Sequence, residues 1–249
     1  MKKSRYDSST EVLQDEAHVW FVTPESVCDP VILQRCHALL DAQERRQFAR
    51  FFHADDSHRY LISHALVRSV LSYYADVAPS SWCFEKGQHG RPEIVSDSLP
   101  HLRFNLTHTT GMAACIVTLN DDCGIDAEQL CIRSNAQGVA ERMFSALELK
   151  QLMRYEGRAF LEYFYECWTL REAYVKARGI GISFPTRQLT FNREGSQISI
   201  RFDAQINDSG SHWHFQLIRP NSTHLTAIAL RHSGKLNKRI RTHPFDFTE

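Results

Sequence analysis

The chain contains an internal repeat, and this repeat limits the folds that are open to it. Glu44 corresponds to Glu148 in a similar segment, at an offset of 104 residues (148 minus 44). Farther along, Arg68 corresponds to Arg171 at an offset of 103 residues (171 minus 68). Any one match of this length arises easily by chance, whereas several in the same order indicate duplication.

Three strand-like segments repeat in the same order: 19–22 with 123–126, 104–107 with 215–218, and 115–119 with 226–230. Because the offsets drift, we infer a duplication followed by short insertions. We predict an α+β fold of two similar subdomains related by a pseudo-twofold axis, each a small, mainly antiparallel sheet packed on a long helix. The boundary near 120–122 divides the chain into 1–121 and 122–249.

Local patterns predict the elements of each half. Helical spacing of apolar residues predicts helices over 42–52, 58–74 and 160–177. The second helix has Asp55 or Ser57 as its predicted cap, and Gly179 is suited to end the third. The buried face of the helix 58–74 is predicted to consist of Ile62, Leu66 and Val70, with Leu61 and Ala65 beside them. Strands are predicted at 190–191 and 197–202, which form a hairpin, and at 212–218 and 225–231.

Composition excludes several classes of protein. With 249 residues, 43% of them hydrophobic, the chain is neither disordered nor collagenous. Its 29 basic residues balance 29 acidic ones, so net charge gives no attraction to nucleic acid or anionic lipid. The longest apolar run, 112–119, is too short to span a membrane. The start lacks the apolar core of a signal peptide, and the seven cysteines form no C-x-x-C. We expect a soluble protein of the reducing cytoplasm.

Two segments of the second half combine carboxylates with a lysine. Asp126 and Glu128 are two residues apart in a predicted strand, so they project to one face, where paired carboxylates suit Mg²⁺. Trp168, Glu172 and Lys176 share one face of a predicted helix. The alternatives are a solvated strand end for the first segment, and a core tryptophan with an exposed ion pair for the second.

Two loops of the first half have residues suited to phosphate. The turn 87–92 contains Arg91, and the segment 105–111 places His108 between hydroxyl groups close to a glycine. Backbone N–H groups, hydroxyls and a histidine can together hold a phosphate. The alternative for each is an ordinary structural loop, and neither is a Walker loop or a dinucleotide fingerprint.

These segments, in this order, resemble the surfactin-type 4′-phosphopantetheinyl transferases. The matching segments are Gly90–Pro92, Phe104–His108, Gly124–Glu128 and Trp168–Lys176, with support from His58–Tyr60 and Leu66–Ser69. The resemblance covers about residues 40–190, and the family consists of two similar halves. It implies that a serine hydroxyl of an apo acyl or peptidyl carrier protein attacks the β-phosphate of coenzyme A. Phosphopantetheine is transferred to the serine, and 3′,5′-ADP leaves.

The resemblance also implies roles for individual residues. Mg²⁺ would be held by Asp126, Glu128 and Glu172. Coenzyme A would be contacted by Arg45, Arg59, Arg91, Thr107, His108 and Lys176. Lys176 would neutralise charge or protonate the leaving group, while Glu172 or a carboxylate-bound water would be the base. Since these residues come from both halves, we expect the active site between them.

The sequence departs from the family pattern at several positions. Ala127 replaces a bulky aliphatic residue, and Arg91 and Arg171 stand where lysine is common. Arg45 and Arg46 match the basic residues that reach the 3′-phosphate only approximately. We expect an acidic carrier protein to dock on 130–143, which contains Ile132, Arg133, Val139, Arg142 and Met143; the alternative is a flexible surface loop.

Two other functions compete with the transferase. Clustered carboxylates with a lysine also serve Mg²⁺-dependent phosphodiester-cleaving enzymes, for which the basic tail 231–241 would be the nucleic-acid surface. The other alternative is a non-catalytic protein that binds coenzyme A. We favour a monomeric transferase with no nucleic-acid partner and no membrane association.

Overall fold

The computed structural model describes residues 10–87, 89–95, 101–181, 184–232 and 238–248. The charged start of the chain, Gln88 of the predicted turn and Lys235 of the basic tail lie outside these residues. The chain divides into two compact units. The first consists of Met1–Gly87, Arg91–Asn120 and Asn237–Glu249, and the second of Gln88–Gly90 and Asp121–Leu236.

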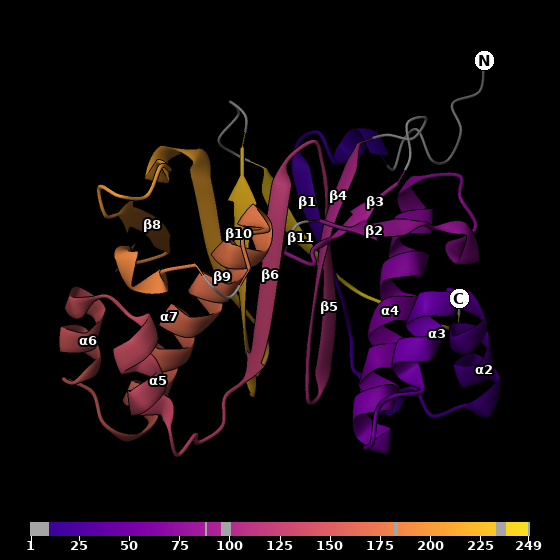
Figure 1. The fold of residues 1–249 in the computed structure, drawn as a ribbon, viewed down its shortest axis with the longest axis horizontal. Helices are drawn as coiled ribbons and strands as arrows, with labels where there is room; N and C mark the ends of the chain where they lie inside the picture. Colours follow the sequence, from indigo (N-terminus) through magenta and orange to yellow (C-terminus); the bar gives the residue numbers. More distant parts are fainter. Residues whose placement is uncertain (1–9, 88, 96–100, 182–183, 233–237, 249) are drawn as a thin grey trace. The chain divides into compact units, whose positions relative to one another are not determined.

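The first unit has a four-stranded sheet in the order β11-β1-β5-β4 (Figure 1). Its strands are β1 (Glu16–Val22), β4 (Leu102–Thr109), β5 (Met112–Leu119) and β11 (Arg239–Pro244). Its helices are α2 (Pro30–Leu39), α3 (Ala42–Phe48) and α4 (Ala54–Tyr74). A hairpin of β2 (Phe84–Lys86) and β3 (Pro92–Ile94) encloses the predicted turn at Arg91. β5 is antiparallel to both β1 and β4, and only β11 is parallel to its neighbour.

The long helix α4 packs on this sheet as its apolar pattern predicts. Ile62, Leu66 and Val70 are completely buried, in one core with residues of β4 and β5. The predicted cap is wrong, because α4 begins at Ala54, and Asp55 lies in its first turn instead. Acidic residues suit the first turn through the helix dipole as well as the cap, so the sequence does not distinguish the two positions.

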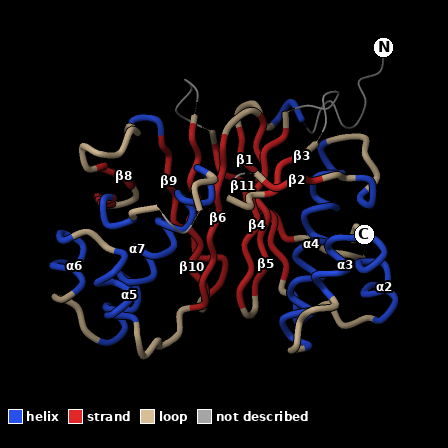
Figure 2. The backbone as a smooth tube through the Cα atoms, viewed as in Figure 1, coloured by secondary structure: helices blue, strands red, loops and turns tan. Residues whose placement is uncertain are grey.

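The second unit repeats this plan with a three-stranded antiparallel sheet in the order β6-β10-β9. Its strands are β6 (Asp122–Gln129), β9 (Trp213–Asn221) and β10 (His224–Arg231), with the hairpin β7 (Leu189–Glu194) and β8 (Gln197–Phe202). Its helices are α5 (Ala136–Met143), α6 (Ala146–Leu152) and α7 (Gly157–Arg178). Gly179 ends α7 in the left-handed conformation, as predicted. Figure 2 shows the helices of each unit on one side of its own sheet.

The order of elements confirms the repeat. The strands β1-β5-β4 correspond to β6-β10-β9, and the helices α3 and α4 to α6 and α7. The predicted match of β5 with β10 at an offset of 111 is wrong. Val22 pairs with Ala113 and Asp126 with Ala227, so the β1–β6 match requires an offset of 114 (227 minus 113) between β5 and β10. An offset of 111 would place Cys115, which faces the core with α4, at Thr226 instead of at a residue of the core with α7.

Each unit contains a buried ion pair at the repeated Glu and Arg positions. Glu44 accepts from the Nε of Arg68 at 2.8 Å, and Glu148 accepts from Arg171. Both arginines are completely buried or nearly so, and both glutamates also complete a capping box at the start of α3 or α6. Arg171 is therefore a structural residue of the second core.

The C-terminal strand differs from the predicted division of the chain. β11 pairs with β1, so this part of the basic tail belongs to the first unit instead of the second half. Arg239 and Arg241 lie 3.1 and 3.2 Å from the carboxylate of Glu16. Two tail cations thus share one carboxylate, which weakens the alternative of a nucleic-acid surface on the tail. In the described part of the chain, no helix is long and apolar enough to cross a membrane.

Candidate active site

Strand β6 and helix α7 approach each other closely at Gly124. A Cβ atom at this position would lie 2.0 Å from the carbonyl oxygen of Ala173 and 2.5 Å from the amide nitrogen of Ala177. Only glycine permits this contact. Since alternate residues of a strand share a face, Asp126 and Glu128 also face α7.

Replacing Gly124 by alanine is expected to separate β6 from α7. The added methyl group meets backbone atoms that cannot turn aside, so we expect Gly124→Ala to lower the free energy of unfolding by about 1–3 kcal/mol. Urea denaturation measures this value. In the control Gly138→Ala, the new methyl group on α5 has no neighbour within 4 Å. Equal losses in both variants would contradict the close-packing account.

Lys176 lies directly against Asp126. Its Nζ donates to Asp126 Oδ1 at 2.6 Å and to the carbonyl oxygen of Ile125 at 3.1 Å. Asp126 is buried, while the Lys176 side chain is 28% exposed. The helix therefore places one cation beside the more buried of the two strand carboxylates, with part of that cation open to solvent.

Glu128 is held by residues of α7 and of the loop that follows β6. Trp168 donates from its Nε1 to Glu128 Oε1 at 2.9 Å, and Arg133 donates to Oε2 at 3.4 Å. Burial raises the pKa of the Glu128 carboxyl above its ordinary value, and the charge of Asp126 raises it further, while Arg133 opposes both. The Arg133 guanidinium also lies 5.9 Å from the ring centre of Trp168.

Glu172 lies between Trp168 and Lys176 on the same face of α7, and it responds to the same charges. Burial raises the pKa of its carboxyl, the charge of Asp126 raises it further, and Lys176 lowers it. Burial and the charge of Asp126 thus make ionisation of Glu128 and Glu172 unfavourable. An additional cation would relieve this repulsion.

The donor set suits Mg²⁺ in its chemistry. As the side chains stand in the described residues, no group of three His, Cys, Asp or Glu is arranged to hold a metal ion. Mg²⁺, however, keeps several waters and commonly uses only one or two protein carboxylates together with substrate phosphates. Asp126, Glu128 and Glu172 supply oxygen donors of this kind on two facing elements. The three side chains therefore fit Mg²⁺ in the type of ligand atom and in charge.

The predicted phosphate residues other than Lys176 lie in the first unit. Thr107 is buried and His108 is exposed on adjacent positions of β4, which face opposite sides of the strand. Arg91 lies with its Nε 3.3 Å from Glu93, and Glu93 also binds Arg103 of β4 at 2.6 Å. The structure therefore joins Arg91 to the strand that contains Thr107 and His108.

The two remaining predicted cations differ in their surroundings. Arg59 pairs with Asp56 at 2.5 Å and lies 3.4 Å from the hydroxyl of Thr110, two residues beyond His108. The first turns of α4 thus reach the predicted phosphate loop. Arg45 is exposed on α3 and makes no ion pair with the described residues.

Sequence reasoning missed two contacts of the site. Trp168 is a hydrogen-bond donor to Glu128, and Arg133 from the predicted docking segment is a second partner of the same carboxylate. For Trp168, the only signal in the sequence was its helical spacing, which places it on the same face as Glu172. The contact of Arg133 with Glu128 could not be predicted, because Arg133 lies in a loop where no periodic pattern shows which way a side chain points.

Comparison with known proteins identifies the family. Residues 122–229 match the family model described as "4′-phosphopantetheinyl transferase superfamily", and residues 30–119 match "4′-phosphopantetheinyl transferase, N-terminal". The 4′-phosphopantetheinyl transferase HetI of Nostoc sp. is 32% identical over 177 residues, which cover 69% of this chain and 72% of that protein. The corresponding enzyme Sfp of Bacillus subtilis is 27% identical over 200 residues, 80% of this chain and 85% of its own length.

A second Bacillus subtilis protein, the 4′-phosphopantetheinyl transferase ffp, is 32% identical over 151 residues, 61% of this chain and 65% of that protein. The two family matches together span both structural units, and the carboxylates of β6 and the carboxylate and lysine of α7 fall within the superfamily match. The chain is an enzyme of the 4′-phosphopantetheinyl transferase superfamily.

Proposed function

We propose that this enzyme transfers the 4′-phosphopantetheine group of coenzyme A to a serine of an apo acyl or peptidyl carrier protein in an Mg²⁺-dependent reaction. The serine oxygen bonds to the β-phosphorus, the bond from that phosphorus to the bridging oxygen breaks, and 3′,5′-ADP leaves. The observation that supports this most is the contact of Lys176 with Asp126 beside two carboxyl groups of raised pKa. We place the reaction in the cytoplasm, with the enzyme as a monomer.

Asp126, Glu128 and Glu172 are the residues that would hold Mg²⁺. When bound, the ion supplies Lewis-acid stabilisation of the pyrophosphate charge. The protein groups around it have separate tasks. Trp168 and Arg133 fix the orientation of Glu128 through hydrogen bonds, and Gly124 lets the strand lie close enough to α7 for the carboxylates to meet.

Lys176 is suited to oppose negative charge on the transferring phosphate. Its ammonium group is held at Asp126 by a 2.6 Å contact and is partly exposed, so it can meet an anionic substrate without leaving its carboxylate partner. Phosphoryl transfer depends mainly on positioning and charge neutralisation of this kind. The serine proton passes to Glu172 or to a water bound by a carboxylate.

Residues of the first unit are proposed to contact the phosphates of coenzyme A. His108 is exposed on β4, and Arg59 lies close to the same loop through Thr110, so both can reach an anion there. Arg91 and Thr107 belong to the same group of neighbouring elements. Arg45 remains the proposed contact of the 3′-phosphate, because its guanidinium on α3 has no ion-pair partner among the described residues.

The segment 130–143 is the proposed docking surface for the carrier protein. Its second part forms α5, in which Val139 and Met143 are partly buried against the core, so they contribute less surface than predicted. Ile132 is 87% exposed and Arg142 is also exposed. An apolar side chain and a cation on one segment suit a helical, acidic partner. Arg133, of the same segment, binds Glu128 and so links the docking surface to the site.

The proposed reaction predicts a strict requirement for a divalent cation. The protein is mixed with coenzyme A and an apo carrier protein, and 3′,5′-ADP is quantified by chromatography. We expect one equivalent of 3′,5′-ADP per carrier with Mg²⁺ and none after chelation, because without the ion the three carboxylates would repel the pyrophosphate. Restored Mg²⁺ must restore the product. Full product formation in the presence of excess chelator would contradict the proposed role of the carboxylates.

A further inference from the structure

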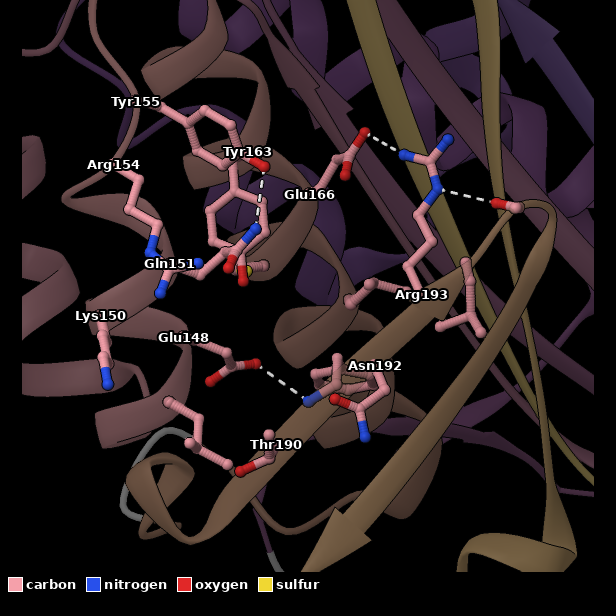
Figure 3. Close-up of a pocket in the computed structure, with 16 residues that line it drawn as sticks. Glu148, Lys150, Gln151, Arg154, Tyr155, Tyr163, Glu166, Thr190, Asn192 and Arg193 are labelled. Carbon is pink, nitrogen blue, oxygen red and sulfur yellow. Dashed lines mark hydrogen bonds and ion pairs between the residues drawn. The ribbon is translucent and has the colours of Figure 1, made fainter.

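A cavity of about 700 Å³ lies in the second unit, between α6, α7 and the β7–β8 hairpin (Figure 3). Its volume is in the range of sites for small organic ligands. Apolar side chains from all of these elements form part of its wall, namely Leu147, Leu170, Phe191 and Ile198. None of the residues proposed to bind Mg²⁺ or coenzyme A lines it.

The cavity and the catalytic residues lie on opposite faces of α7. Tyr163, Cys167 and Leu170 line the cavity, and they cluster on one side of a helix with 3.6 residues per turn. The row that contains Glu172 and Lys176 is centred on the other side of the same helix. A ligand in the cavity therefore occupies a site separate from the reaction.

The charges that line the cavity do not cancel. Glu148 is neutralised by the buried Arg171, and Glu166 by Arg193 at 2.5 Å. Lys150 of α6 and Arg154 of the turn that follows α6 both line the cavity, and neither has a carboxylate partner among the described residues. Two positive charges therefore remain at one side of the cavity (Figure 3).

The wall next to these cations is aromatic and has hydrogen-bonding groups. The rings of Tyr155 and Tyr163 lie 5.4 Å apart between centres. The Nε2 of Gln151 donates to the hydroxyl oxygen of Tyr155 at 2.9 Å, which orients that hydroxyl at the cavity. Flat apolar surface beside unpaired cations favours a ligand with an aromatic body and an acidic group.

We propose that this cavity is a second ligand site, for small aromatic anions. The aromatic body lies against Tyr155, Tyr163 and Phe191, and the carboxylate, sulfonate or phosphate group binds Lys150 and Arg154. The site is independent of phosphopantetheine transfer, so its existence and the proposed reaction can fail separately.

Anilinonaphthalene sulfonate is a suitable probe, because it combines an aromatic body with a fixed negative charge. Fluorescence titration of the full-length protein is expected to give saturable binding that weakens with added NaCl, since the charges at the site are partly exposed. The double variant K150A/R154A is expected to raise the dissociation constant about tenfold or more, because two charge-assisted contacts are lost. An unchanged dissociation constant in this variant would overturn the proposal.

Three controls separate this site from unspecific binding. Arg158→Ala removes a cation that is 82% exposed, pairs with Glu162 and does not line the cavity, so the dissociation constant should stay as in the wild type. Glu172→Ala alters the opposite face of α7 and should also leave it unchanged. The neutral probe N-phenylnaphthylamine should bind K150A/R154A as it binds the wild type. Equal weakening by Arg158→Ala, or of the neutral probe, would contradict the assignment, as would competition of coenzyme A with the sulfonate probe.

Discussion

Asp126→Asn is expected to lower kcat/KM for carrier modification by about a thousandfold, the scale of losing a principal electrostatic contact in an active site. Asp126 is central to the charges of the cluster: it binds Lys176 at 2.6 Å, and its charge raises the pKa of both Glu128 and Glu172. The neutral amide keeps the shape of the side chain but removes a proposed metal ligand and the counter-charge of Lys176. Initial rates of carrier modification, measured by mass spectrometry, give this value.

The control for Asp126→Asn is Glu194→Gln, which neutralises an exposed carboxylate at the end of β7. It should leave kcat/KM unchanged. Thermal unfolding of Asp126→Asn should stay close to that of the wild type, which excludes loss of the fold as the cause. Near-full activity of a folded Asp126→Asn variant would show that the cluster is not the reaction centre.

Arg171→Met is expected to give the largest loss of stability, about 3–5 kcal/mol, because it leaves the Glu148 charge buried without its partner. Arg171 also donates at 3.0 Å to three carbonyl oxygens, those of Met143, Cys167 and Leu189. Methionine fills similar volume and satisfies none of these acceptors. Urea denaturation with circular dichroism gives the free energy of unfolding.

A matched exposed ion pair provides the comparison for Arg171→Met. Arg158 pairs with Glu162 at 2.9 Å on the surface of α7, and Arg158→Met should change the free energy of unfolding by less than about 1 kcal/mol. The contrast tests burial as the cause, since both substitutions remove a guanidinium from the same helix. Similar losses in the two variants would contradict the structural role assigned to Arg171.

The repeat could be predicted from the sequence because the duplicated segments keep both residue type and order. Glu44 with Glu148 and Arg68 with Arg171 stand out as matched pairs, and the structure shows that each pair is one buried ion pair. The sequence alone could not reveal this burial. Charged residues are usually exposed, so the burial of these two ion pairs can be seen only in the three-dimensional structure.

The elements that could not be predicted lack a periodic signal. Strand β11 reads Arg-Ile-Arg-Thr-His-Pro, with little apolar alternation, and it forms because its backbone pairs with β1. The cavity on α7 depends on how α6, α7 and the β7–β8 hairpin, which follow one another in the sequence, pack together. By contrast, strand spacing predicts that Asp126 and Glu128 share a face, and helix spacing predicts the same for Glu172 and Lys176. That these two pairs meet across β6 and α7 was implied only by the family resemblance.

The most direct test of the proposed reaction is the intact mass of an apo carrier protein after incubation with this enzyme, coenzyme A and Mg²⁺. We predict a mass increase of one phosphopantetheine group on the carrier serine, absent when Mg²⁺ is chelated and absent when that serine is replaced by alanine. Both an acyl and a peptidyl carrier protein are tested. Unmodified carriers of both kinds, with the enzyme folded and a known transferase modifying the same samples, would contradict the account.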